Sequence, residues 1–185
     1  MVGHAPEQLL TAPAASLFVL TIAYDPTRWS EFAVGVVGAS ATLVGLLFVA
    51  VSINLQRILQ FKGLPARAGQ TLIFLATPLF TALFILVPNQ SSSALAGELF
   101  AVAFFTGAAH LRICVQSGRS EHEVFSLWLA NRVVPASGTT LCLVLAGATM
   151  LAQSGGGLYW TVPSVVIAVA IGIANAWVLL VEILR

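Results

Sequence analysis

The chain has 185 residues, of which 58% are hydrophobic and only 8% are charged, and its mean hydropathy is +0.96. A soluble domain carries about 25% charged residues, so this composition excludes an ordinary soluble fold and predicts an integral membrane protein. The formal net charge of +1 excludes a broad basic surface, and with it nucleic acid as a partner.

The N-terminal segment, residues 1–24, is apolar but differs from the rest of the chain. Its apolar run is short, is interrupted by Pro13, and lacks the basic start and the cleavage site of a secretory signal. We interpret it as a short helix lying in the membrane interface, with a partial span or a poorly ordered extension as the alternatives. A single membrane domain then occupies residues 25–185.

Asp25 and Pro26 predict the start of the first helix of this domain. Aspartate caps helices through its side chain, and proline is tolerated at the first helical position. Trp29 follows within one turn, where we expect an aromatic belt at the membrane surface.

Five apolar segments long enough to cross a bilayer follow, at residues 32–55, 71–87, 94–113, 133–152 and 159–184. A helix needs about 20 apolar residues to cross the hydrocarbon core, whereas barrel strands alternate over about ten. The sequence therefore predicts an all-α fold, a polytopic membrane helix bundle of about five transmembrane helices. Pro78 is expected to bend the second helix, with Thr77 or Thr81 satisfying part of the freed backbone.

The loop between the third and fourth segments carries a helix signal of its own. Ser120-Glu121-His122-Glu123 matches the S-x-x-E capping box, and an apolar run leads from it to Pro135. We predict a short surface helix there, on the cytoplasmic side. Consecutive side chains point in different directions on a helix, so we expect a solvated helix start at this triplet rather than a metal site.

The basic residues predict the orientation of the chain. Seven of the eight lie near the loops after the first and third spans or at the C-terminus: Arg57, Lys62, Arg67, Arg112, Arg119, Arg132 and Arg185. The two loops on the other side contain no lysine or arginine. Because basic loops stay inside, we expect a multi-pass protein with a cytoplasmic C-terminus and with Asp25 on the extracytoplasmic side.

The first span carries a row of small and polar residues on one helical face. Its members recur at steps of three, four and seven: Gly35, Gly38, Thr42, Gly45, Ser52 and Gln56. We call this row the small-residue seam, and we expect a packing or pore-facing surface because small residues let membrane helices approach closely. Three interpretations stay open. Another helix of the same bundle packs on the seam, a second subunit packs on it, or it lines the axis of a ring of protomers.

Polar and ionisable residues within the spans are the other candidates for a functional role. They are Asn54, Glu98, His110, Arg112, Asn175 and Glu182. We expect a polar cluster near the inner membrane surface, in which Glu182 pairs with Arg112 or with another arginine. A structural pairing and proton or ion handling through His110 and Glu182 both stay open. Asn175 should face protein or water, because an unpaired amide is costly in lipid.

The sequence lacks the motifs of known enzyme classes, such as H-E-x-x-H, G-x-S-x-G and the P-loop. Its two cysteines, Cys114 and Cys142, are far apart and indicate neither a disulfide framework nor a metal pair. We therefore expect no enzymatic activity, no cofactor and no metal site. No internal repeat stands out, which argues against an inverted-repeat transporter.

Two parts of the chain resemble a family of small bacterial multi-span membrane proteins. They are YDPTRW at 24–29 with GLLFVAVSINL at 45–55, and AWVLLVEILR at 176–185. The resemblance covers the first and last spans. Members of this family are sometimes labelled modulators of a membrane-bound ATP-dependent protease. The resemblance implies a multi-span helical fold in the bacterial cytoplasmic membrane and carries over no catalytic residues.

These features predict a non-enzymatic integral membrane protein that acts as an oligomeric or regulatory subunit through helix packing on the first span. Its expected partners are the lipid bilayer and either a second copy of the chain or another membrane protein. A homo-oligomeric channel or transporter for ions or small solutes is the alternative.

Overall fold

The computed structural model describes residues 22–61, 63–117 and 132–184, and within these ranges it is helical and contains no strand. This confirms the predicted all-α fold. Five described helices are long and apolar enough to cross a membrane. They are α2 (Ser30–Ile53), α4 (Leu64–Ile85), α5 (Ser92–Ser117), α7 (Val134–Ala152) and α8 (Thr161–Leu184). Short elements complete them: the 3₁₀ helices η2 (Pro26–Trp29) and η4 (Gly157–Trp160), and α3 (Leu55–Gln60).

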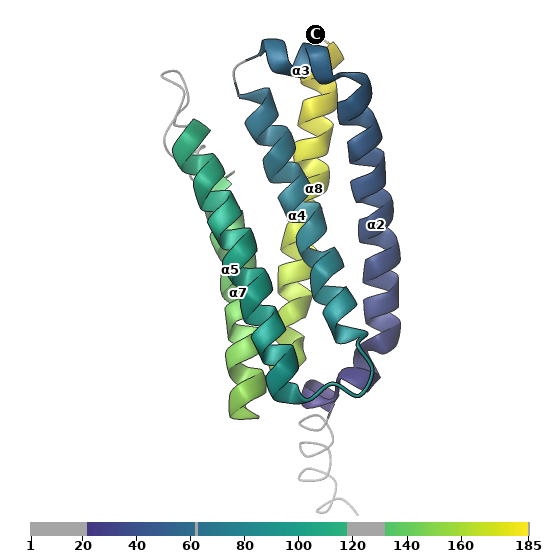
Figure 1. Ribbon diagram of the computed structural model, residues 1–185, viewed down its shortest axis with the longest axis vertical. Coiled ribbons are helices and arrows are strands. Elements are labelled where there is room, and N and C mark those ends of the chain that lie inside the picture. Colours follow the sequence, from purple (N-terminus) through teal and green to yellow (C-terminus); the bar gives the residue numbers. More distant parts are fainter. Residues whose placement is uncertain (1–21, 62, 118–131, 185) are drawn as a thin grey trace, which may run out of the picture.

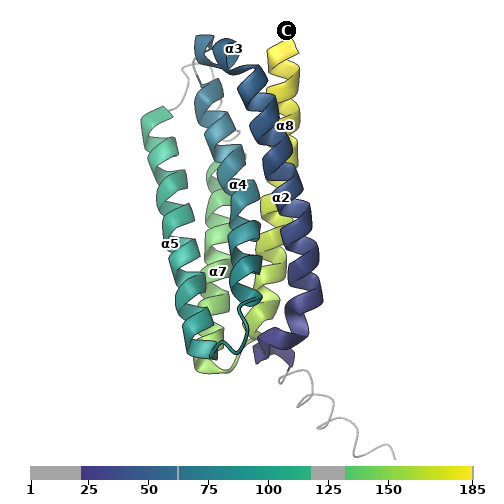
Figure 2. The same cartoon turned by 45° about the vertical axis from the view of Figure 1, so that its right-hand side comes forward.

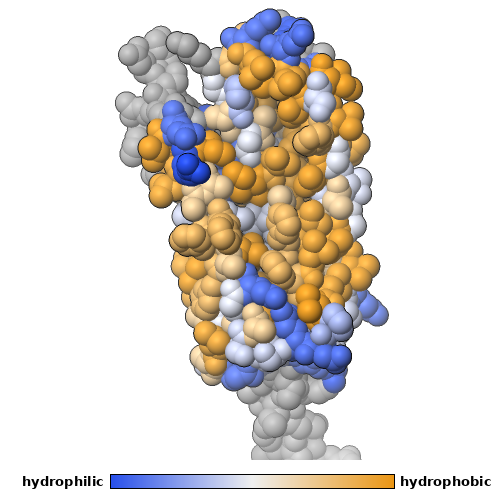
Figure 3. Space-filling model, viewed as in Figure 1, coloured by the Kyte–Doolittle hydropathy of each residue, from blue (hydrophilic) through white to orange (hydrophobic). Residues whose placement is uncertain are grey.

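The five long helices run side by side as one elongated bundle (Figure 1). Helix α4 is its centre and packs against α2, α5 and α8, while α7 packs against α5 and α8. Helix α2 lies at the edge of the bundle, with α4 between it and α5 (Figure 2). The middle of the visible surface is mostly hydrophobic and hydrophilic residues gather toward both ends, as expected for a bundle that spans a bilayer (Figure 3).

The second span begins earlier than the sequence indicates. Helix α4 starts at Leu64 rather than at residue 71, so Arg67 lies on the helix and not in a loop. Gly63 has a φ of 99°, a left-handed conformation that glycine adopts without strain, and Pro65 fits the first helical turn. These two residues therefore place the start of the helix before its apolar part begins.

The first span ends at Ile53, and the chain then forms the separate helix α3. Asn54 joins the two helices, and its side-chain amide donates to the Ala50 carbonyl at 2.9 Å. The backbone N–H of Asn54 bonds the same carbonyl at 3.3 Å, so both groups of this residue close the last turn of α2. Gln56 consequently lies on α3, so the small-residue seam runs along α2 only as far as Ser52.

The predicted helix start at Asp25 is confirmed. Its carboxylate accepts from the Thr27 amide at 3.0 Å and from the Thr27 hydroxyl at 2.6 Å. Trp29 lies at the end of the bundle, where an aromatic belt was expected, but its side chain packs inward and not on the surface. Its side chain is buried, its indole N–H donates to the Ile22 carbonyl at 2.9 Å, and its ring packs against Tyr159 with the centroids 4.9 Å apart.

Pro78 lies within α4, and the helix continues through it. Proline lacks the N–H that would bond the carbonyl four residues earlier, which is that of Phe74. The Thr77 hydroxyl donates to the Ile73 carbonyl at 2.7 Å, and the Thr81 hydroxyl donates to the Thr77 carbonyl at 2.9 Å. Both threonines bond their own helix as expected, but neither bond reaches the carbonyl that the proline leaves free.

Two glycines let helices of the bundle approach one another closely. A Cβ atom on Gly147 of α7 would lie 3.2 Å from the Ala96 carbonyl oxygen of α5 and 3.1 Å from the Phe100 ring. A Cβ atom on Gly172 of α8 would lie 2.8 Å from the Cγ atom of Leu75 on α4. These contacts use small residues to bring membrane helices together, as packing in lipid requires.

Two predicted elements lie largely outside the described residues. The interfacial helix falls on residues 1–24, of which the structure describes only 22–24. The surface helix on the cytoplasmic side falls on 120–135, of which it describes 132–135. Both stay predictions.

Candidate functional site

Helix α2 attaches to the bundle along one narrow face. Its buried residues are Ala33, Ser40 and Leu47, which recur every seven residues. This face packs mainly on α4. Successive residues of a helix are turned by about 100°, so two residues correspond to about 200°. A residue two places from any of these three therefore points away from the bundle.

The small-residue seam occupies that outward face. Gly35 follows Ala33 by two places, Gly38 and Thr42 flank Ser40 by two on either side, and Gly45 precedes Leu47 by two. All six predicted members of the seam are exposed: Gly35, Gly38, Thr42, Gly45, Ser52 and Gln56. A Cβ atom on any of its three glycines would meet nothing within 4 Å.

The glycines of the seam thus differ from Gly147 and Gly172, which are buried where other helices approach. The interpretation that a helix of the same bundle packs on the seam is wrong for the described part of the chain. The Thr42 hydroxyl donates to the Gly38 carbonyl at 2.8 Å, so its polar group is already satisfied within α2. The outward face of α2, on which Val49 is also exposed, is therefore a surface that lipid or another chain can contact.

The predicted polar cluster is not assembled as one group. Asn54 and Gln56 lie beyond the end of α2, whereas His110 and Arg112 lie on α5, across α4 from α2 (Figure 2). Arg112 is exposed. The expected pairing of Glu182 concerns a side chain that lies outside what the structure describes.

The two remaining polar candidates are separate from one another. Glu98 lies near the first turns of α5, at the opposite end of that helix from His110, and accepts a hydrogen bond from the Gln90 side-chain amide. Asn175 lies on α8 and is half-buried, and the expectation that its amide faces protein or water stays a prediction.

His110 is one of three described residues whose side chain has a buried atom without a hydrogen-bond partner, together with Ser40 and Gln90. It is 3% exposed, and its ring stacks at a tilt on Phe74 of α4 with the centroids 4.4 Å apart. Its Nδ1 atom is buried and has no hydrogen-bond partner among the described residues. An unsatisfied buried nitrogen costs free energy, so the ring gains from a rotation that brings this atom to a polar partner.

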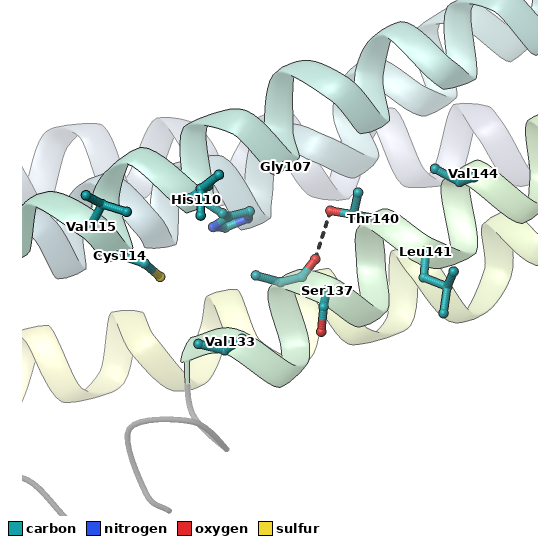
Figure 4. Close-up of a pocket in the computed structure, with 11 residues that line it drawn as sticks. Gly107, His110, Cys114, Val115, Val133, Ser137, Thr140, Leu141 and Val144 are labelled. Atoms are coloured by element: carbon teal, nitrogen blue, oxygen red, sulfur yellow. Dashed lines mark hydrogen bonds between the residues drawn. The ribbon is translucent and has the colours of Figure 1, made fainter. Parts of the chain in front are cut away.

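A groove of about 640 Å³ opens between α5 and α7 beside this histidine (Figure 4). Its wall on α5 is formed by Gly107, His110, Leu111, Cys114 and Val115. Its wall on the α7 side is formed by Val133, Ala136, Ser137, Thr140, Leu141 and Val144. His110 was predicted as a candidate from the sequence, but the groove was not. The spacing of Gly107, His110 and Cys114 by three and four residues was the available signal, because it puts them on one helical face.

The two hydroxyl groups in the groove are already bonded. Thr140 donates to the Ala136 carbonyl at 2.8 Å, as Figure 4 shows, and Ser137 donates to the Val134 carbonyl at 3.0 Å. Within the described part of the chain, no three histidine, cysteine, aspartate or glutamate residues come together as metal ligands. The groove is therefore an apolar space with the His110 imidazole in its wall, and the unsatisfied Nδ1 atom of that ring is itself buried.

No family model, curated protein or solved structure matches the chain. The resemblance of the first and last spans to a family of small bacterial membrane proteins stays a prediction.

Proposed function

We propose that the chain is a non-enzymatic membrane subunit that associates with a second copy of itself through the small-residue seam of α2. The observation that carries this proposal is the exposure of the seam on the face of α2 opposite its buried residues. Glycine costs a helix about 1 kcal/mol relative to alanine in water. Three exposed glycines on one face of a single helix therefore favour a role in packing against something outside the chain.

The physics of helix association in lipid supports this choice of surface. Lipid tails are as apolar as leucine, so burying an apolar helix face against another helix gives little hydrophobic free energy in the membrane. Association depends on close packing, and the empty space around Gly35, Gly38 and Gly45 lets a partner backbone approach. The same face on two copies can meet across a two-fold axis, which gives a closed dimer.

A homo-oligomeric channel or transporter is the second candidate. The exposed polar side chains at the end of the seam, Ser52 and Gln56, favour it, because a ring of protomers would bring them around one axis. The internal hydrogen bond of Thr42 favours the packing role instead. Sealed vesicles containing the purified protein distinguish the two, since a channel raises the flux of ions or small solutes above that of empty vesicles.

We further infer a location in the bacterial cytoplasmic membrane with the C-terminus inside. Arg57, Arg67, Arg112 and Arg132 belong to helix ends that meet at the same end of the bundle, the upper end in Figure 1. A reporter enzyme that is active only in the cytoplasm should be active when it is fused to Arg185, and an inactive fusion would contradict this orientation.

The association is tested by energy transfer between donor-labelled and acceptor-labelled chains in vesicles. Gly45→Leu fills the seam with a large side chain and should weaken association roughly tenfold or more, equivalent to about 1.4 kcal/mol. Gly97→Leu is the matched control, because Gly97 on α5 is also exposed and a Cβ atom there would also meet nothing within 4 Å. Equal transfer in the wild type and in both variants would contradict the proposal.

A further inference from the structure

The groove between α5 and α7 has a property that self-association through α2 does not use. We propose that it binds an uncharged amphiphile from the bilayer, with the hydroxyl group of the ligand bonded to the imidazole of His110 and the hydrocarbon chain lying along α5 and α7. This inference is independent of the role of the seam, because α2 contributes no residue to the groove.

The lining of the groove selects the charge of the ligand. None of the described residues that line it is charged. A phosphate or carboxylate placed there would lose its water without gaining a cationic partner, which is costly in a low-dielectric environment. An uncharged head group avoids that cost.

The imidazole selects a hydroxyl group. A neutral histidine has one nitrogen that donates and one that accepts, and which of the two carries the proton depends on its surroundings. A hydroxyl both donates and accepts, so it can bond the ring in either tautomer once the ring turns its buried Nδ1 atom toward the groove. The hydroxyl groups of Ser137 and Thr140 are already bonded to their own helix. His110 is therefore the polar side chain in the wall that gains a hydrogen bond when a ligand binds.

The position and size of the groove fit entry from the bilayer. Its rim includes Leu111, Val115 and Leu141, which are 65%, 73% and 58% exposed on the apolar surface of the bundle. A ligand can therefore enter sideways from lipid without crossing the membrane surface. The volume of about 640 Å³ lies within the range of about 300–1,000 Å³ that is usual for small-molecule sites.

A second groove, between α4 and α5, provides an internal comparison. It has a volume of about 370 Å³ and includes Ile73, Phe80 and Phe105 in its wall. Its one hydroxyl group, that of Thr106, donates to the Val102 carbonyl at 2.7 Å. It is thus an apolar groove without an unsatisfied polar atom, and labelling there measures only how much of a probe has entered the bilayer.

The test uses two photoactivatable probes in phosphatidylcholine vesicles that contain the full chain. One is hexadecanol with a diazirine in its chain, and the other is the same hydrocarbon ending in a methyl group. After irradiation, mass spectrometry of peptides measures labelling of each groove. We expect the alcohol to label the groove between α5 and α7 about fivefold more than the hydrocarbon, the factor expected for one net hydrogen bond. Both probes should label the comparison groove equally.

His110→Phe keeps an aromatic ring against Phe74 and removes the nitrogen atoms, so the preference for the alcohol should disappear. Competition keeps the proposal testable if this variant fails to fold: excess unlabelled hexadecanol should remove the labelling in the wild type, and hexadecane should not. Equal labelling of the groove by both probes in the wild type would overturn the proposal and would indicate that water satisfies His110. Retention of the preference in a folded His110→Phe variant would overturn it as well.

Discussion

The contact between α8 and α4 at Gly172 gives a sharp prediction about stability. A methyl group added at Gly172 would lie 2.8 Å from the Cγ atom of Leu75, which is well inside van der Waals contact. Leu75 is 1% exposed and belongs to the core, so its side chain has little room to move. Gly172→Ala must therefore shift either the leucine side chain or one of the two helices.

Two opposing effects determine how Gly172→Ala changes the free energy of unfolding. Overpacking of a core by one methyl group costs about 1–3 kcal/mol. Replacing a helical glycine by alanine gains about 1 kcal/mol in aqueous helices. Gly97→Ala receives the same gain without the clash, because a Cβ atom at Gly97 meets nothing within 4 Å. We expect Gly172→Ala to be less stable than Gly97→Ala by about 1–3 kcal/mol.

Reversible unfolding in mixed micelles, with increasing sodium dodecyl sulfate, measures this difference. Leu75→Ala alone should destabilise the protein by about 2–5 kcal/mol because it leaves a cavity. The double variant should be more stable than the sum of the two single effects indicates, since each change makes room for the other. Equal stabilities of Gly172→Ala and Gly97→Ala, or strict additivity in the double variant, would refute the close packing of α8 on Leu75.

Two further predictions concern the start of α2. Trp29→Phe removes the bond to the Ile22 carbonyl and should lower the free energy of unfolding by about 1–2 kcal/mol, measured in the same micelles. Hydrogen bonds from the Thr27 hydroxyl and amide hold the pKa of Asp25 below its ordinary value of 3.8. This stabilisation is present at neutral pH and is lost as the pH falls below 3.8 through the lowered pKa. The loss should be small, because the carboxylate is solvent-exposed, and it should appear in thermal unfolding of the wild type but not of Asp25→Asn.

The number and type of the helices could be predicted because length and hydropathy are local physical requirements of the bilayer. The start of α4 could not be predicted in the same way. Its first turns contain polar residues, such as Arg67 and Gln70, that are typical of a loop. Gln70 is nevertheless buried, and its amide donates to the Arg132 carbonyl at 3.4 Å, a partner 62 positions away that no local pattern indicates.

The function of the small-residue seam could likewise be predicted only in part from the sequence. The periodicity identified a face of α2, and the structure places that face on the outside. Periodicity alone does not say what covers a face, because Gly172 belongs to a comparable row on α8, with Ser164, Ala168 and Ala176, and packs inside the bundle. Trp29 was assigned to the membrane surface from its position near a helix start, whereas its burial depends on Tyr159 from the far end of the sequence.

The groove beside His110 depends on two helices whose facing residues are about 30 positions apart. The spacing of Gly107 and His110 indicates a common face of α5, but the opposite wall comes from Ser137 and Thr140 of α7. The Nδ1 atom of His110 lacks a hydrogen-bond partner because none of the described residues packed around the ring offers one. The sequence of α5 alone cannot indicate this.

Native mass spectrometry of the full chain, released gently from its own membrane, tests the central claim most directly. Self-association through the seam predicts a complex whose mass is a multiple of the 19.4 kDa chain. It also predicts that Gly45→Leu shifts the signal to the single chain and that Gly97→Leu does not. A wild type found only as the single chain, or only in complexes with other proteins, would contradict the claim. So would a Gly45→Leu variant that keeps the full complex.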